Sequence, residues 1–248
     1  MHIWLYTIIS VILVSLVSLI GVFTLALKPQ RLQKITLFLV SFAAGALFGD
    51  TFIHLLPASF DKSGKNLSVP LLIILGIVFF FILEKFLRWR HCHAQPCEAH
   101  LRPVVAMNLI GDAVHNFLDG VMIGASFLVN PTIGITTALA VILHEIPQEI
   151  GDFGILLHGG LSVKKALFFN FLCALTAIAG ALISLIIGAY VQNYTLFLLP
   201  IIAGGFLYIA GSDLIPELQH ELKLSTSCWQ LFLMLLGVGV MALLVLFE

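Results

Sequence analysis

The chain has 248 residues, of which 60% are hydrophobic and only 10% are charged, and its net charge is −1. Soluble domains carry about 25% charged residues, so this composition excludes a soluble globular protein and predicts an integral membrane protein. The length leaves no room for a separate soluble domain, and a near-neutral chain gives no reason to expect a nucleic-acid partner.

Eight apolar runs are each about 20 residues long, which is enough to cross a bilayer as a helix. They cover residues 3–27, 35–56, 69–87, 104–129, 133–157, 166–191, 196–218 and 229–247. We therefore predict an all-α fold of eight transmembrane helices in a single polytopic domain, residues 1–248.

Basic residues predict the orientation of this bundle. Ten of the twelve lysines and arginines fall in the loops after the first, third, fifth and seventh helices. Only Lys62 and Lys65 fall on the other side. By the positive-inside rule the basic loops are cytoplasmic and both termini are external.

The N-terminus has no basic region or cleavage site, so we expect the first helix to be retained. A short chain without organelle signals suits a bacterial cytoplasmic membrane.

The predicted cytoplasmic loop at residues 88–103 is rich in cysteine and histidine. Its possible metal ligands are His91, Cys92, His93, Cys97 and His100. Cytoplasmic thiols stay reduced, and the spacing fits no structural zinc module closely. We interpret the segment as a solvated loop with weak metal affinity, and a role as a sensor or delivery segment is a hypothesis.

A short internal repeat bears on the architecture. Ala44-Gly45 and Pro57 recur as Ala203-Gly204 and Pro216, at a constant offset of 159 residues. The same offset relates the first helix to the sixth and the third to the eighth, with opposite directions across the membrane. This pattern predicts two inverted three-helix repeats, helices one to three and six to eight, which flank the central helices four and five.

Polar side chains form a stripe along each of the two central helices. Because a helix advances about 100° per residue, spacing decides which side chains share a face. One narrow stripe of the fourth helix holds Asp112, His115, Asn116 and Asp119, and a broader side of the fifth holds His144, Glu145, Gln148, Glu149 and Asp152. Ionisable residues at membrane depth avoid lipid, so we expect the two stripes to face each other.

The donor atoms on these stripes are imidazole nitrogens and carboxylate or amide oxygens, without a thiolate. This set suits Zn²⁺, Fe²⁺ or Mn²⁺ better than Cu⁺. Two ions bridged by Asp119 or Glu149 are conceivable. A hydrogen-bond network that holds the helices together is the structural alternative, although such networks usually use Ser, Thr or Asn. Pro147 predicts a kink that frees the Leu143 carbonyl for the site, unless it is merely a tolerated proline.

Further polar residues lie outside the central group. They could trace a path across the membrane, or they could lie hydrated at its interfaces. They are Asp50, His54, Asp152, His158, Asp213, Glu217 and His220. Asn170 in the sixth helix is either a further ligand or a partner in a helix–helix hydrogen bond.

The polar motifs resemble those of the ZIP family, the Zrt/Irt-like divalent metal transporters. The run from His144 to Asp152 is similar to HExPHExGD, the fifth-helix motif of one subfamily. The run from His115 to Gly120 and the segments around Asp50 and Asp213 resemble the same subfamily, so the match covers nearly the whole chain.

The resemblance implies a two-metal site in the transport path. The ligands it implies are His115, Asn116, Asp119, His144, Glu145, Gln148 and Glu149, with Asn170 as a possible contributor. It also implies a homodimer and an elevator motion of helices one, four, five and six against two, three, seven and eight. Gln148 departs from the family pattern, which has histidine there. An amide oxygen is a poorer ligand than imidazole for such ions, so one subsite is expected to be weaker or to favour another ion.

We therefore predict a transporter of divalent transition metal ions, most simply zinc and otherwise iron or manganese, toward the cytoplasm. It needs no other cofactor, and it is not an enzyme. The first alternative is an intramembrane zinc-dependent hydrolase, but the zincin motif would need a second histidine where Gln148 stands. The second alternative is a proton-coupled carrier of a non-metal substrate, which would not explain why histidines and carboxylates cluster.

Overall fold

The computed structural model describes residues 2–25, 27–63, 67–91, 101–191, 193–220 and 223–247. Every regular element in this part of the chain is helical. In chain order the elements are α1 (His2–Val17), η1 (Ser18–Ile20), α2 (Gly21–Thr24), α3 (Pro29–Gly49), η2 (Asp50–Leu55), α4 (Leu56–Ser63), α5 (Ser68–His91), α6 (Leu101–Val129), α7 (Pro131–His158), α8 (Val163–Ala174), α9 (Thr176–Tyr190), α10 (Tyr194–Tyr208), η4 (Ile209–Leu214), α11 (Ile215–Gln219), α12 (Leu224–Leu244) and η5 (Val245–Phe247).

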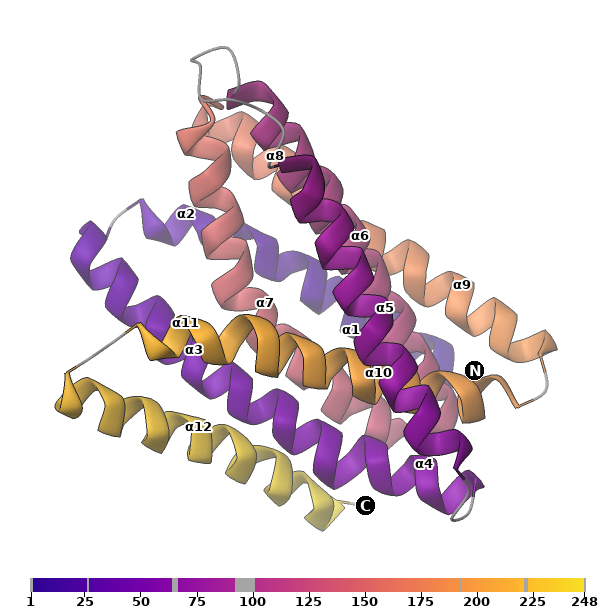
Figure 1. Ribbon diagram of the computed structural model, residues 1–248. Helices are drawn as coiled ribbons and strands as arrows, with labels where there is room; N and C mark the ends of the chain where they lie inside the picture. The colour runs from indigo at the N-terminus through magenta and orange to yellow at the C-terminus, as the bar shows by residue number, and fades with distance from the viewer. Residues whose placement is uncertain are drawn as a thin grey trace.

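Several of these elements join end to end into long rods (Figure 1). By length and composition, six helices in the described residues could cross a membrane: His2–Thr24, Lys34–Asp61, Ser68–Lys85, Val163–Tyr190, Tyr194–Gln219 and Leu224–Leu244. The two long helices outside this set, α6 and α7, carry the polar stripes. Apolar side chains such as Phe232 on α12 and Ile82 on α5 are more than half exposed, as expected of lipid-facing surfaces.

Residues 88–103, predicted to form a loop, are helical at both ends. Helix α5 continues to His91, and α6 begins at Leu101. Nothing in the sequence of α5 stops the helix at Leu87, and Pro103 is acceptable because the first turn of a helix needs no backbone donors. The side chain of His91 and residues 92–100 lie outside the description, and with them all five possible ligands of the Cys/His segment.

Two π-helical turns interrupt the rods at related positions. They are η2 at Asp50–Leu55 and η4 at Ile209–Leu214, and both are six residues long. Each ends just before a proline, Pro57 or Pro216. A proline cannot donate to the carbonyl four residues earlier and its ring pushes on that turn, so the preceding turn widens. The two π-turns are separated by the same 159 residues as the sequence repeat.

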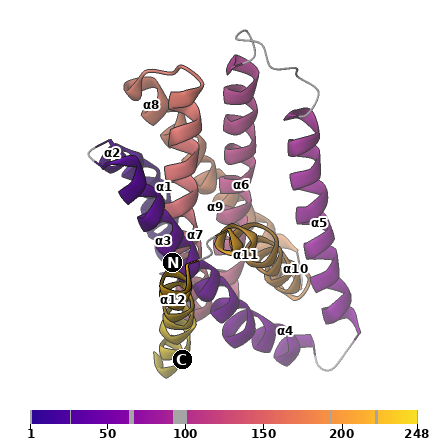
Figure 2. The ribbon, with the colours of Figure 1, turned by 60° about the vertical axis from the view of Figure 1, so that its left-hand side comes forward.

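Close helix crossings hold the bundle together. Helix α3 lies beside α12, α10 beside α5, and α6 packs against α7 and α9 (Figure 2). At the α3–α12 crossing, a Cβ on Gly45 would collide with the backbone carbonyl of Met234, so only glycine allows this approach. Asn130 begins α7 by accepting a hydrogen bond from the backbone N–H of Ile133 at 2.8 Å, with Pro131 in the first helical position.

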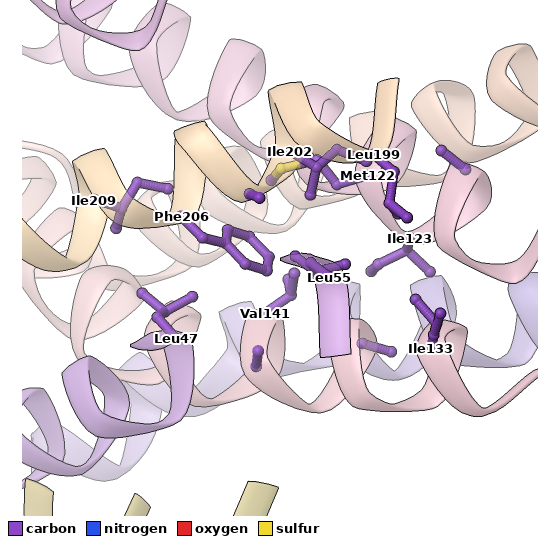
Figure 3. Close-up of a cluster of buried hydrophobic side chains, with 14 of the residues drawn as sticks. Leu47, Leu55, Met122, Ile123, Ile133, Val141, Leu199, Ile202, Phe206 and Ile209 are labelled. Carbon is purple, nitrogen blue, oxygen red and sulfur yellow. The ribbon is translucent and has the colours of Figure 1, made fainter. Parts of the chain in front are cut away.

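The main apolar core lies where α3, η2, α6, α7 and α10 meet. Figure 3 shows Phe206, Leu55 and Val141 close together, with Ile123 nearby, and all four are buried.

Residues at the starts of α3, α8 and α12 and at the end of α7 share one end of the bundle. We call it the basic end because Lys34, Lys164 and Lys223 lie there.

Candidate metal centre

Helices α6 and α7 each contribute one imidazole and one carboxylate to a single cluster. Its members are His115 and Asp119 on α6 and His144 and Glu145 on α7. One ligand atom from each lies within 4.8 Å of all the others. Asp119, His144 and Glu145 are at most 1% exposed. The two polar stripes therefore do face each other, and they meet at these four residues.

The separations within the cluster match those expected around one small ion. His144 Nε2 lies 3.4 Å from Asp119 Oδ2 and 3.8 Å from Glu145 Oε1. His115 Nε2 lies 3.5 Å from Glu145 Oε1 and 3.8 Å from Asp119 Oδ2. Bonds of about 2.0–2.2 Å to a tetrahedral zinc ion place its ligand atoms about 3.3–3.6 Å apart. The four donors are thus spaced slightly wider than an occupied zinc site.

A hydrogen bond to the backbone orients His144. Its Nδ1 lies 3.1 Å from the carbonyl oxygen of Ala140, one turn earlier on α7. A carbonyl oxygen only accepts, so Nδ1 carries the proton and donates it. In the neutral ring this leaves the Nε2 lone pair facing Asp119 and Glu145. Metal-binding histidines are commonly held this way, since the second nitrogen fixes both the tautomer and the ring orientation.

The two carboxylates of the cluster have buried oxygens without hydrogen-bond partners. These atoms are both oxygens of Asp119 and Oε1 of Glu145. Their close neighbours are the two histidines, and no lysine or arginine among the described residues pairs with either carboxylate. Buried charge is costly unless it is paired or coordinates a metal. Two carboxylates with two neutral imidazoles balance the charge of one divalent cation.

A cavity of about 440 Å³ reaches the cluster from the basic half of the bundle. Helices α5, α6, α7 and α10 with η4 line it, and His115, Asp112, Gln148 and Asp152 face it. The His115 side chain is 20% exposed, whereas that of His144 is 1% exposed. On the other side of the cluster Phe206 packs edge-on against the His144 ring, with 6.2 Å between ring centroids. The cluster is therefore open toward the basic end and covered by the apolar core on the opposite side.

Two amide–carboxylate pairs lie next to the cluster. Asn116 donates to Asp112 Oδ1 at 2.7 Å, and Asn170 on α8 donates to Glu149 Oε2. In each pair the second oxygen of the carboxylate and the amide oxygen are buried without a partner. Asn170 also lies 3.3 Å from the carbonyl of Ser18. Asn116, Glu149 and Asn170 thus stand beside the four-residue cluster and keep free oxygen atoms.

The outlying polar residues occupy four other places. Asp50 and His54 lie in η2, where His54 Nε2 is 3.0 Å from the carbonyl of Met241 and Asp50 contacts Thr137. Asp213 lines the 440 Å³ cavity. Glu217 and His220 line a second cavity of about 820 Å³ at the basic end. His158 is exposed in the last turn of α7. None of these residues belongs to the four-residue cluster.

Glu84 and Tyr208 line the cavity and were not predicted from the sequence. The Tyr208 hydroxyl donates to the Glu84 carboxylate across the α10–α5 crossing, and both side chains face the cavity. Glu84 is a carboxylate near the end of the apolar run 69–87, followed directly by Lys85, and an ionisable residue within a span is the signal that could have identified it.

The chain is similar to a family of known proteins. The family model described as ZIP Zinc transporter matches residues 1–100 and 90–245. Mouse zinc transporter ZIP13 is 34% identical over 283 aligned positions, which cover 94% of this chain and 78% of ZIP13. The zebrafish (Danio rerio) zinc transporter ZIP10 is 42% identical over 158 positions, or 61% of this chain. The Caenorhabditis elegans zinc transporter zipt-7.2 is 28% identical over the whole chain. The match covers only 19% of the length of the zebrafish ZIP10.

Proposed function

Because this chain belongs to the ZIP zinc transporter family, we propose that it carries divalent transition metal ions, zinc first, across a membrane toward the cytoplasm. The observation that carries the proposal is the cluster of His115, Asp119, His144 and Glu145, whose donor atoms lie within 4.8 Å of one another. Together they replace the hydration shell of the ion and balance its charge. The transported ion is the substrate, and no other cofactor is required.

The cavity supports a pathway through the cluster. His115 faces the 440 Å³ cavity on the side of the basic end, which the positive-inside rule assigns to the cytoplasm. The apolar core with Phe206 and Val141 covers the other side. An ion in the cluster would thus exchange with one side of the membrane only in this conformation. Transport then requires a second conformation that opens the opposite side.

A second ion would bind beside the first. Asn116, Glu149 and Asn170 each keep a buried oxygen without a hydrogen-bond partner, as does Asp112. These oxygens lie on the stripes that carry the first cluster, with Asn170 added from α8. Gln148 faces the cavity near His115, so its amide oxygen is a candidate ligand for either ion. Two neighbouring subsites would keep each ion weakly enough bound to leave.

The arrangement of helices supports eight spans, with both termini external, and the inverted repeat. The π-turns η2 and η4 and the glycines Gly45 and Gly204 recur at an offset of 159 residues, and both glycines pack against backbone. The pairing of α3 with α12 mirrors that of α10 with α5. On this basis we propose that α1, α6, α7, α8 and α9 form a moving bundle. The scaffold is α3, α5, α10 and α12, in an elevator motion within a homodimer.

Zinc is the preferred substrate because imidazole and carboxylate ligands suit it, while Fe²⁺ and Mn²⁺ stay candidates. The relatives named above come from animals, so they lend no support to a bacterial cytoplasmic membrane, and the membrane that holds this protein stays a prediction. Relatives named zinc transporters also argue against both the zinc-dependent hydrolase and the carrier of a non-metal substrate.

Uptake of Zn²⁺ into proteoliposomes tests the proposal. The purified wild type should transport Zn²⁺, and Asp119→Ala should abolish uptake because it removes a buried ligand. Asp61→Asn is the matched control, because Asp61 is exposed at the far end of the α3–α4 rod. Fe²⁺ and Mn²⁺ as competitors would give the selectivity order. Folded wild-type protein that moves none of the three ions would contradict the proposal.

A further inference from the structure

A second buried carboxylate lies apart from the metal cluster, in the π-turn η2. Asp50 is 0% exposed. The Thr137 hydroxyl on α7 lies 3.3 Å from Asp50 Oδ2 and 3.1 Å from Ser126 Oγ on α6. A threonine hydroxyl has one hydrogen, so Ser126 donates to Thr137 when Thr137 donates to Asp50. Three helices thus meet at this carboxylate through hydroxyl groups.

Buried oxygen atoms in η2 are left without partners. Asp50 Oδ1 and Thr51 Oγ1 are buried, and neither has a hydrogen-bond partner among the described residues. An unpaired carboxylate oxygen at this depth is costly and indicates a missing ligand. Asp50 interacts with Thr136, Thr137 and the titratable His54. We call Asp50 and the three hydroxyl residues Ser126, Thr136 and Thr137 the Asp50 site.

The Asp50 site is stacked on the metal cluster along both central helices. Ser126 lies seven residues after Asp119, and Thr137 lies seven residues before His144, so each pair shares a helix face. Seven residues span about 10 Å along a helix axis. The buried apolar side chains Ile123 and Val141 lie between the two levels. The two sites are therefore neighbours that share no ligand.

The chemistry of the Asp50 site differs from that of the metal cluster. Its oxygen donors are one carboxylate and three hydroxyl groups, and the nearby His54 holds its Nε2 3.0 Å from the carbonyl oxygen of Met241. Oxygen donors of this kind select hard cations. One negative charge balances one positive charge, whereas a divalent ion would keep an uncompensated charge in a buried place.

We propose that the Asp50 site binds one sodium ion, which accompanies the divalent ion during transport. The site lies in η2, where a π-helical turn replaces the regular α-helical hydrogen bonding, and such turns are frequent at functional sites. Asp50 belongs to the scaffold, whereas Ser126, Thr136 and Thr137 belong to the moving bundle. The site is therefore complete only when the two groups of helices are aligned, so sodium binding and bundle position are coupled. This coupling rests on the proposed function, but the binding itself does not.

Equilibrium binding of ²²Na⁺ to the purified full-length protein tests the site without any transport. The wild type should bind about one Na⁺ per chain, because the single carboxylate of the Asp50 site balances the charge of one monovalent ion. Asp50→Asn should lose the binding, since it removes the charge and keeps the shape. Thr137→Val should weaken the binding, since it removes one oxygen donor in an isosteric side chain. The matched control Asp61→Asn should bind as the wild type does.

Zn²⁺ binding to the metal cluster serves as the folding check for each variant. A wild type that binds no ²²Na⁺, including one whose Asp50 instead takes up a proton, would overturn the proposal. So would equal ²²Na⁺ binding by a folded Asp50→Asn. In proteoliposomes an inward Na⁺ gradient should stimulate Zn²⁺ uptake by the wild type. Absence of all Zn²⁺ uptake with intact, Asp50-dependent ²²Na⁺ binding would refute the transport function and leave the sodium site standing.

Discussion

The Nε2 atoms of His115 and His144 lie 3.4 Å apart, although the residues are 29 positions apart on different helices. With His144 Nδ1 donating to Ala140, its Nε2 has a lone pair to offer. Two imidazole nitrogens at this distance, each beside the carboxylates of Asp119 and Glu145, are placed to ligate the same ion. Helices α6 and α7 therefore build the centre jointly.

Removal of one imidazole should nearly abolish zinc binding. We expect His144→Ala to weaken Zn²⁺ affinity by more than about 100-fold, because loss of a residue that only hydrogen-bonds to a metal ligand already costs about 10–100-fold. Isothermal titration calorimetry of the purified protein measures the change. His2→Ala is the control, since His2 is exposed in the first turn of α1. Equal loss of affinity in both variants would contradict the assignment.

A histidine at position 148, as in the HExPHExGD motif that the sequence resembles, should strengthen the site. Gln148 faces the cavity beside His115, and histidine is a better ligand than an amide for zinc. We expect Gln148→His to raise Zn²⁺ affinity and to shift competition further in favour of Zn²⁺ over Mn²⁺. Competition titrations with both ions measure this shift. A Gln148→Asn variant, which keeps an amide, should show no such gain.

The second ion should depend on Glu149. The Glu149 carboxylate pairs with Asn170 and keeps a buried free oxygen outside the four-residue cluster. We expect Glu149→Gln to bind one Zn²⁺ where the wild type binds two, with the tighter ion unaffected. Metal analysis after equilibrium dialysis measures the stoichiometry. Two ions retained at unchanged affinity would show that Glu149 is a structural residue.

The close crossing of α3 and α12 should tolerate no side chain. A Cβ on Gly45 meets the Met234 carbonyl, whereas a Cβ on Gly239 meets nothing within 4 Å. We expect Gly45→Ala to cost about 1–3 kcal/mol as overpacking. Gly239→Ala, on the same pair of helices, should leave stability unchanged or slightly higher. Thermal unfolding in detergent compares the two variants, and an equal Tm would contradict the crossing.

Much of the architecture follows from the pattern of apolar residues. Each of the predicted spans corresponds to a helical rod in the described residues, and the resemblance to the ZIP family is confirmed. Helix ends were less predictable, because the end of α5 at His91 depends on where the backbone hydrogen bonds stop rather than on hydropathy. The π-turns were not predicted, since a proline can also kink or be tolerated in a membrane helix.

The sequence by itself determined the membrane character, the two polar stripes and the family motif, because hydropathy and helical periodicity are local properties of a chain. Only the tertiary structure decided which members of each stripe share a centre. His115, Asp119, His144 and Glu145 converge, whereas Asn116 pairs with Asp112 and Glu149 with Asn170. Likewise, the Asp50 carboxylate contacts the hydroxyl of Thr137, which lies 87 residues later in the chain. Such contacts depend on how helices cross and rotate against one another, and that follows from the packing of the whole bundle.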